Sequence, residues 1–158
     1  MNHLLGKRTL FVAVILVAGC LVFIGALAPD TVVLRRKLME SNNSAVAEAI
    51  NKAIKERNFP EIQVRVNAVM ENMDKVLDYF PSGSLSENSR AMPEIWKKWD
   101  EFSKNPSRVK KAAQELADAA KAGDEETVKV RFKALGEACK NCHSSFRAPK
   151  PKKEEEFR

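Results

Sequence analysis

Residues 139–143 read Cys-Lys-Asn-Cys-His, and their types and spacing predict one particular chemistry. Two cysteines separated by two residues and followed at once by a histidine form the attachment sequence of a c-type haem. The thiols of Cys139 and Cys142 would form thioether bonds to the haem, and the imidazole of His143 would be an axial ligand of the iron. The motif therefore predicts one covalently attached haem c in each chain.

Two other uses of a Cys-x-x-Cys pair fit the sequence less well. A thioredoxin-like redox pair follows a strand and precedes a helix, whereas here a long helical pattern precedes the motif and a charged tail follows it. A structural zinc site needs four ligands. Only Cys20 and His3 remain to complete one, and both lie in or beside an apolar N-terminal run.

The composition is typical of a helical domain with an apolar appendage. Charged residues make up 30% of the 158 residues and hydrophobic residues 44%. The formal net charge is +6, but the basic residues are interleaved with acids, as in the sequence EIWKKWDE at 94–101. Such mixing is typical of solvated helix faces. We therefore expect one domain with an accessory segment and no nucleic-acid partner.

The apolar run is expected to be a membrane anchor. Residues 10–28 carry no charge and as a helix would span about 28 Å, close to the hydrocarbon thickness of a bilayer. Two basic residues precede the run, which favours a cytoplasmic N-terminus. Residues 1–28 would then tether the chain to the inner membrane, with the haem domain in the periplasm. Two alternatives remain: signal cleavage, which Pro29 disfavours and which would leave a soluble periplasmic protein, and lipoprotein processing at Cys20.

The rest of the chain predicts an all-α fold. Apolar residues recur at alternating spacings of three and four, as in helices that pack into a bundle. No useful alternation with a period of two indicates strands. Short links between the first two segments and between the last two favour an antiparallel four-helix bundle behind the N-terminal anchor helix. The expected helices cover about 30–57, 60–80, 93–122 and 124–148, with a polar loop over 81–92.

Particular residues set the predicted helix boundaries. Gly123 is expected to end the third helix and Asp124 to cap the fourth. Pro106 is expected to kink the third helix or to divide it at Asn105. The charged tail that follows the fourth helix is expected to be disordered. The chain would thus comprise an anchor or signal segment (1–28), a haem domain (29–148) and a tail (149–158).

The haem motif continues the apolar face of the fourth helix, so the haem is expected inside the bundle against this helix. Only 15 residues follow His143, so any sixth iron ligand must come from upstream. The candidates are Met39, Met70, Met73 and Met92. Met39 is favoured because Arg35 lies one turn before it on the same helix face. Arg35 and its neighbour Arg36 are candidates for pairing with a haem propionate.

With these features, the chain resembles the cytochrome c prime family over about residues 29–148. The residues that carry the resemblance are Arg35 followed by Met39, the sequence Pro-Glu-Ile-Trp at 93–96, the Ala-Gly-Asp link at 122–124, and the haem motif followed by Phe146 and Arg147. The resemblance implies a four-helix bundle, commonly a homodimer through its first two helices, with an apolar distal pocket that admits nitric oxide and carbon monoxide. One departure is the loop before the third helix, where the family often has an acidic or polar haem contact and this chain has Ser89 and Arg90.

The resemblance also implies roles for individual residues. His143 would be the proximal ligand, Arg147 the basic residue beside its face, and Met39 the residue that closes the distal side. We therefore expect five-coordinate, high-spin iron. The alternative is a low-spin electron carrier in which Met39 binds the iron.

The expected function is electron transfer, or binding of nitric oxide or carbon monoxide, by a membrane-tethered periplasmic cytochrome that meets redox partner proteins. A sensor or partner-binding subunit held near a membrane complex is a second reading. We expect no enzymatic activity. Catalysis on nitric oxide or peroxide is less favoured, because it usually needs polar distal groups and Asn42 is the nearest to Met39.

Overall fold

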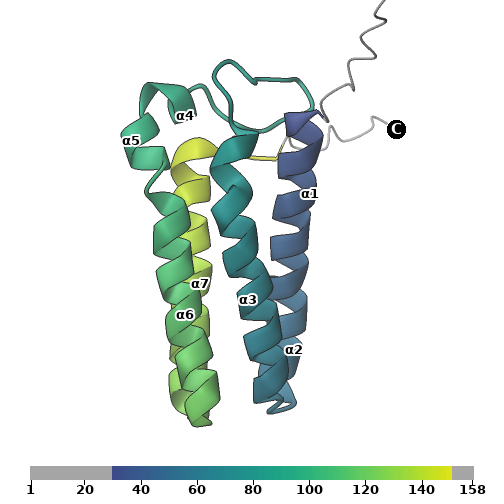
Figure 1. Cartoon of the computed structure of the whole chain (residues 1–158), viewed down its shortest axis with the longest axis vertical. Helices are drawn as coiled ribbons and strands as arrows, with labels where there is room; N and C mark the ends of the chain where they lie inside the picture. The colour runs from purple at the N-terminus through teal and green to yellow at the C-terminus, as the bar shows by residue number, and fades with distance from the viewer. Residues whose placement is uncertain (1–29, 151–158) are drawn as a thin grey trace, which may run out of the picture.

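Four long helical segments run side by side along the molecule (Figure 1). The computed structural model describes residues 30–150. The first segment joins α1 (Thr31–Asn43), the π-helical η1 (Ser44–Ile50) and α2 (Asn51–Lys55), the second joins α3 (Phe59–Lys75) and the 3-10 helix η2 (Val76–Tyr79), and the others are α6 (Asn105–Ala122) and α7 (Glu125–Phe146). Within residues 30–150 there is no strand, so the predicted all-α, antiparallel four-helix bundle is confirmed.

The helix boundaries follow from capping residues. Three side chains accept a hydrogen bond from a first-turn backbone amide: Asp30 caps α1, Asn58 caps α3 and Asp124 caps α7. Each satisfies an amide that has no partner within the helix. Gly123 ends α6 with φ of 71°, a left-handed conformation that glycine adopts without strain. The predicted roles of Gly123 and Asp124 are thus confirmed.

The predicted third helix is divided. Two short helices, α4 (Glu94–Lys97) and α5 (Trp99–Phe102), precede α6. The new helix begins at Asn105 and carries Pro106 in its first turn, where the missing backbone N–H costs no hydrogen bond. The predicted division at Asn105 is therefore confirmed. The further break at Lys98 was not predicted from the sequence.

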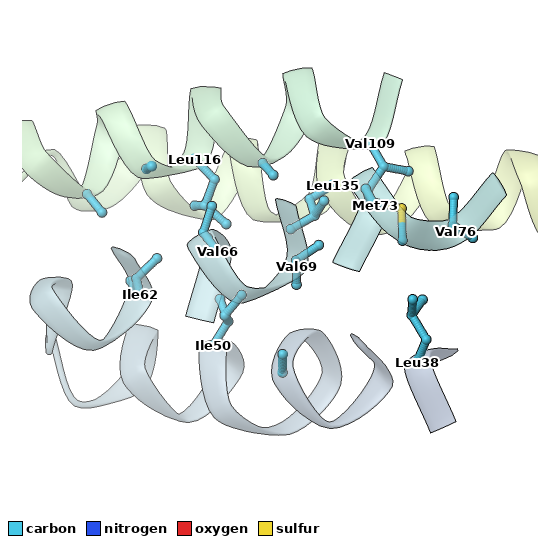
Figure 2. Close-up of a cluster of buried hydrophobic side chains, with 14 of the residues drawn as sticks. Leu38, Ile50, Ile62, Val66, Val69, Met73, Val76, Val109, Leu116 and Leu135 are labelled. Carbon is cyan, nitrogen blue, oxygen red and sulfur yellow. The ribbon is translucent and has the colours of Figure 1, made fainter. Parts of the chain in front are cut away.

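The hydrophobic core lies between the four segments (Figure 2). Burying each of its large aliphatic side chains stabilises the fold by about 1.5–3 kcal/mol. Figure 2 shows Leu38 reaching from α1 toward Met73 and Val76. The largest fully buried side chains are Ile50, Ile62, Ile95, Leu116, Leu135, Val66, Val69 and Val128.

The loop between η2 and α4 crosses the upper end of the bundle in Figure 1, where α1 begins and α7 ends. An isolated antiparallel bridge between Ala91 and Arg147 ties this loop to the end of α7. In this loop bridge, the Met92 amide donates to the Phe146 carbonyl at 3.0 Å and the Ala148 amide donates to the Arg90 carbonyl at 2.8 Å. The bridge was not predicted, and it holds residues 90–92 beside the haem motif.

The predicted anchor, residues 1–28, lies outside the described residues, as does most of the charged tail. No helix within residues 30–150 has the length and apolar character needed to cross a bilayer.

Candidate haem site

The three residues of the haem motif lie together on the upper part of α7. Spacings of three and four residues place Cys139, Cys142 and His143 on one side of this 22-residue helix, as predicted. Both thiols are free, half-buried and packed against the core. The imidazole of His143 is also half-buried.

An aromatic layer closes the bundle just above the motif. The ring of Phe146 lies edge-on to that of Phe102, with centroids 5.3 Å apart, and Phe102 lies edge-on to Phe80 at 4.9 Å. The guanidinium carbon of Arg35 is 4.9 Å from the Phe80 ring centroid. The layer therefore crosses the bundle from α7 through α5 and the end of η2 to α1.

The position of this layer along the bundle can be compared with the positions of the two residues that the sequence predicts on either side of the iron. His143 lies about one turn below Phe146 on α7, and Met39 lies one turn below Arg35 on α1. The two side chains are therefore at a similar depth on different helices. This is the relation that a proximal and a distal residue require.

The helices are not packed equally against one another. Whereas α7 packs extensively against α6 and also contacts α2, it shares no extensive contact with α1. Met39 on α1 and Cys139 and Cys142 on α7 are only half-buried, although all three pack against the core. A flat, largely apolar group held by the two cysteines would complete their burial, so the residues present fit haem c.

Arg35 provides a second test of that fit. It is the one buried charged side chain in the described part of the chain, with 3% of its surface exposed. Its guanidinium donates to the Ser84 carbonyl at 2.7 Å, to the Ser84 hydroxyl at 3.1 Å and to the Ser89 hydroxyl at 2.7 Å. All three acceptors are neutral, and burial lowers the pKa of Arg35 while Asp30 opposes the shift. A buried cation needs a counter-charge, and a haem propionate would supply one.

The other predicted residues are placed as follows. Arg36 is exposed, one position around the helix from Arg35, and its role at a propionate stays a prediction. Met73 is buried in the core, whereas Met70 and Met92 are half-buried. Asn42 is buried beside Met39, and its Oδ1 accepts a hydrogen bond from Asn72 Nδ2 at 2.8 Å.

The surroundings of His143 keep its imidazole neutral. Burial lowers its pKa, and the charge of Arg90 adds a smaller effect in the same direction. Neutral imidazole is the form that binds iron. Nη1 of Arg147 lies 3.3 Å from Nδ1 of His143, and because a guanidinium can only donate, the two form a hydrogen bond only in the tautomer whose Nδ1 is unprotonated. In that tautomer the ring proton is on Nε2, so a metal bound at Nε2 would require the other tautomer, in which the proton is on Nδ1 and Arg147 lies beside it without a hydrogen bond.

The two thiols are also neutral in the folded chain. Burial raises the pKa of Cys139, and burial followed by the charge of Cys139 raises the pKa of Cys142 to about 11. Both therefore carry their protons at neutral pH.

Sequence reasoning named Ser89 and Arg90 in this loop but missed the pairing of the loop with Arg35. Ser84 and Ser89 accept from Arg35, and Ser89 also accepts from the Ala91 amide at 3.1 Å, which links α1 to the loop bridge. The partners in the Arg35 contacts are about fifty residues apart in the chain, so no local pattern relates them. The available signals were the polar composition of residues 81–92 and the haem contact that the resemblance implies at the position of Ser89 and Arg90.

Fold and site together define a c-type cytochrome built on a four-helix bundle. The family model described as cytochrome C' matches residues 30–147, and the chain belongs to the cytochrome c' family. The predicted family is therefore confirmed, and it is a family that binds haem c.

Individual relatives agree with this assignment. Cytochrome c' of Rhodospirillum rubrum is 30% identical over 145 residues, which cover 90% of this chain and 99% of the relative. The nitric oxide complex of a variant cytochrome c prime from Alcaligenes xylosoxidans superposes with a TM-score of 0.68 at 23% identity, covering 77% of this chain and 95% of that one. A cytochrome c' described as having an unusual ligand-controlled dimer dissociation gives a TM-score of 0.69 at 24% identity, with coverages of 78% and 98%.

Proposed function

We propose that this protein is a cytochrome that holds one covalently bound haem c, binds nitric oxide or carbon monoxide at the iron, and exchanges electrons with redox partner proteins without turning over a substrate. The supporting observation is that Cys139, Cys142 and His143 share one side of α7, about one turn or more below an aromatic layer that reaches Arg35, and that Met39 follows Arg35 by one turn on α1. Cys139 and Cys142 would hold the haem, His143 Nε2 would bind the iron, and Arg35 would pair with a propionate. The bound haem supplies an iron that changes oxidation state and accepts an added ligand.

The inner face of α1 favours small neutral ligands over catalysis. Its buried members besides Arg35 and Asn42 are apolar, and Arg35 and Asn42 already hydrogen-bond to protein groups. Neither polar residue is a carboxylate or a histidine, the groups that most often transfer protons in catalysis. A neutral diatomic molecule needs no such group, whereas peroxide cleavage or nitric oxide reduction usually does.

Optical spectroscopy of the purified holoprotein tests this function. We expect the alkaline pyridine complex to show a haem whose vinyl groups are both saturated, because both thiols have reacted. Addition of carbon monoxide to the ferrous protein is expected to shift its Soret band, because the side opposite His143 is free to take a ligand. Turnover of nitric oxide or peroxide above that of free haem would contradict the non-enzymatic part of the proposal, and a Soret band unmoved by carbon monoxide would contradict gas binding.

We further propose that the protein works as a homodimer tethered to the inner membrane and facing the periplasm. The uncharged run at 10–28 supports the tether. Exposed Val33 on α1 and Val64 on α3, 43% and 58% accessible, support contact through the first two segments, as does the dimer in the description of one structural relative. After extraction with detergent, sedimentation should give twice the chain mass and mass spectrometry an N-terminus ahead of residue 10. A chain that starts near residue 29, or at a lipidated Cys20, would disprove the tether, and a monomer would disprove the dimer.

A further inference from the structure

The two tryptophans of the chain have different surroundings. Trp96 is half-buried, and its indole N–H donates to the carbonyls of Phe80 and Pro81 at 3.2 and 3.0 Å. Trp99 on α5 makes no such bond within residues 30–150, and with 37% of its surface accessible it is the one exposed aromatic side chain in that range. An exposed indole with an unused N–H is a group that protein partners often bind.

The exposed ring rests on the aromatic layer. The ring centroid of Trp99 is 5.6 Å from that of Phe102, which is 5.3 Å from that of Phe146. Aromatic rings that touch have centroids about 4.5–7 Å apart, so these three rings form a continuous series from the surface to α7. Phe146 follows Cys142 by one turn on the same side of α7. The series therefore leads from the surface to a residue that would carry the haem.

A row of positive charge begins close to Trp99 in the chain. Figure 1 shows α5 at the upper end of α6, and three exposed basic residues at spacings of four and three share one face at the start of α6. This basic row consists of Lys104, Arg108 and Lys111. None of the three has a carboxylate within ion-pair distance among residues 30–150. Asp100 and Glu101 are exposed beside Trp99, but residues 98–111 hold five basic residues against these two acids. The surface therefore complements an acidic partner.

We propose that Trp99 and the basic row form the surface on which an acidic electron-transfer protein docks, and that electrons pass between this partner and the haem through the aromatic layer. The inference rests on the proposed haem function. The reduced partner loses one electron and the ferric iron gains it, and no bond is made or broken. Electron tunnelling weakens steeply with the width of the gap that it must cross, so rings in contact favour transfer from a partner placed over Trp99. Transient redox complexes bury little surface, so one exposed ring and a few charges suffice to guide docking.

Binding without electron transfer gives the first test. The probe is oxidised flavodoxin, a small acidic flavin protein, titrated into the ferric haem-loaded protein in a calorimeter at low ionic strength. Trp99→Gln is expected to weaken binding roughly tenfold, as for other exposed aromatic anchors. Lys104→Gln should weaken it by a smaller factor, because a charge at the rim of an interface contributes less.

Two variants are matched controls. Lys121 is exposed at the opposite end of α6 and also has no carboxylate partner among residues 30–150. Val130 is an exposed apolar residue on α7, 64% accessible. Lys121→Gln and Val130→Gln should both bind flavodoxin as the parent does.

Electron transfer gives the second test. In a stopped-flow experiment the anionic flavin hydroquinone of reduced flavodoxin becomes the neutral semiquinone, so only an electron moves to the ferric iron. At saturating flavodoxin, Trp99→Gln should accept electrons more slowly than the parent, whereas Trp99→Phe should stay close to it because a ring remains over Phe102. Added salt should slow the parent at subsaturating flavodoxin more than it slows Lys104→Gln.

The outcomes that overturn the inference are distinct from those that overturn the proposed function. A parent that does not bind flavodoxin, unchanged binding in both Trp99→Gln and Lys104→Gln, or an equal loss in Lys121→Gln would overturn the docking surface. A saturated rate in Trp99→Gln equal to that of the parent would overturn the aromatic route. If Trp99→Gln fails to fold, Lys104→Gln and Lys121→Gln decide on the surface. Absence of haem from the parent would overturn the proposed function instead.

Discussion

A chain in which Cys139 and Cys142 are both replaced by alanine is expected to release all of its haem to acidified organic solvent, whereas the parent keeps its haem in the protein fraction. Each thiol supplies one of the two covalent bonds, and His143 alone binds through a coordination bond that acid breaks by protonating the imidazole. The measurement is the absorbance of the two phases after extraction, compared for equal amounts of protein.

The third cysteine provides the control for this experiment. Cys20 stands in the apolar run and outside the motif, so Cys20→Ala should retain haem as fully as the parent. Each single substitution in the motif should leave one thioether and hence a haem that acid does not extract. Extraction of haem from the parent itself would show that the motif does not attach it covalently.

Shortening Met39 to alanine is expected to give the second large effect, a faster binding of carbon monoxide to the ferrous protein. Met39 is half-buried against the core on α1, one turn after Arg35, so in the proposed site it would fill the space where a distal ligand enters. Its removal should raise the association rate about tenfold or more, which corresponds to lowering a barrier by about 1.4 kcal/mol. Flash photolysis measures this rate, and the spin state should change little, because the iron is expected to be five-coordinate in the parent.

Met70→Ala is the matched control, since Met70 is another half-buried methionine packed against the core, on α3. We expect its rate to stay near that of the parent. A low-spin parent with a sulfur-to-iron charge-transfer band in the red, lost in Met39→Ala and kept in Met70→Ala, would contradict the five-coordinate iron. The protein would then be an electron carrier with a methionine ligand.

Most of the bundle was predictable because its determinants are local. Alternating spacings of three and four residues fixed which helix faces are buried. Gly123, Asp124 and Pro106 act on the backbone within a turn of their own positions, so the boundaries that they set were confirmed. The same holds for the motif, in which helical spacing alone brings Cys139 and His143 to one side of α7.

The features that escaped prediction depend on residues distant in sequence or lack a sequence signal. The loop bridge joins Ala91 to Arg147, and the Arg35 hydrogen bonds join α1 to Ser84 and Ser89. Each requires the finished fold before the partners meet. The π-helical η1, with the sequence SAVAEAI, contains neither glycine nor proline, so nothing local distinguishes it from an ordinary helical turn.

The burial of the two thiols has a consequence for the order in which the protein matures. With the pKa of Cys142 raised to about 11, only about one such thiol in ten thousand is ionised at pH 7, and the thiolate is the reactive form. The aromatic layer and the loop bridge also close the end of the bundle above these thiols. A chain that folds before it receives haem would therefore be a poor substrate for attachment, and we expect the covalent step to precede the docking of α7 into the bundle.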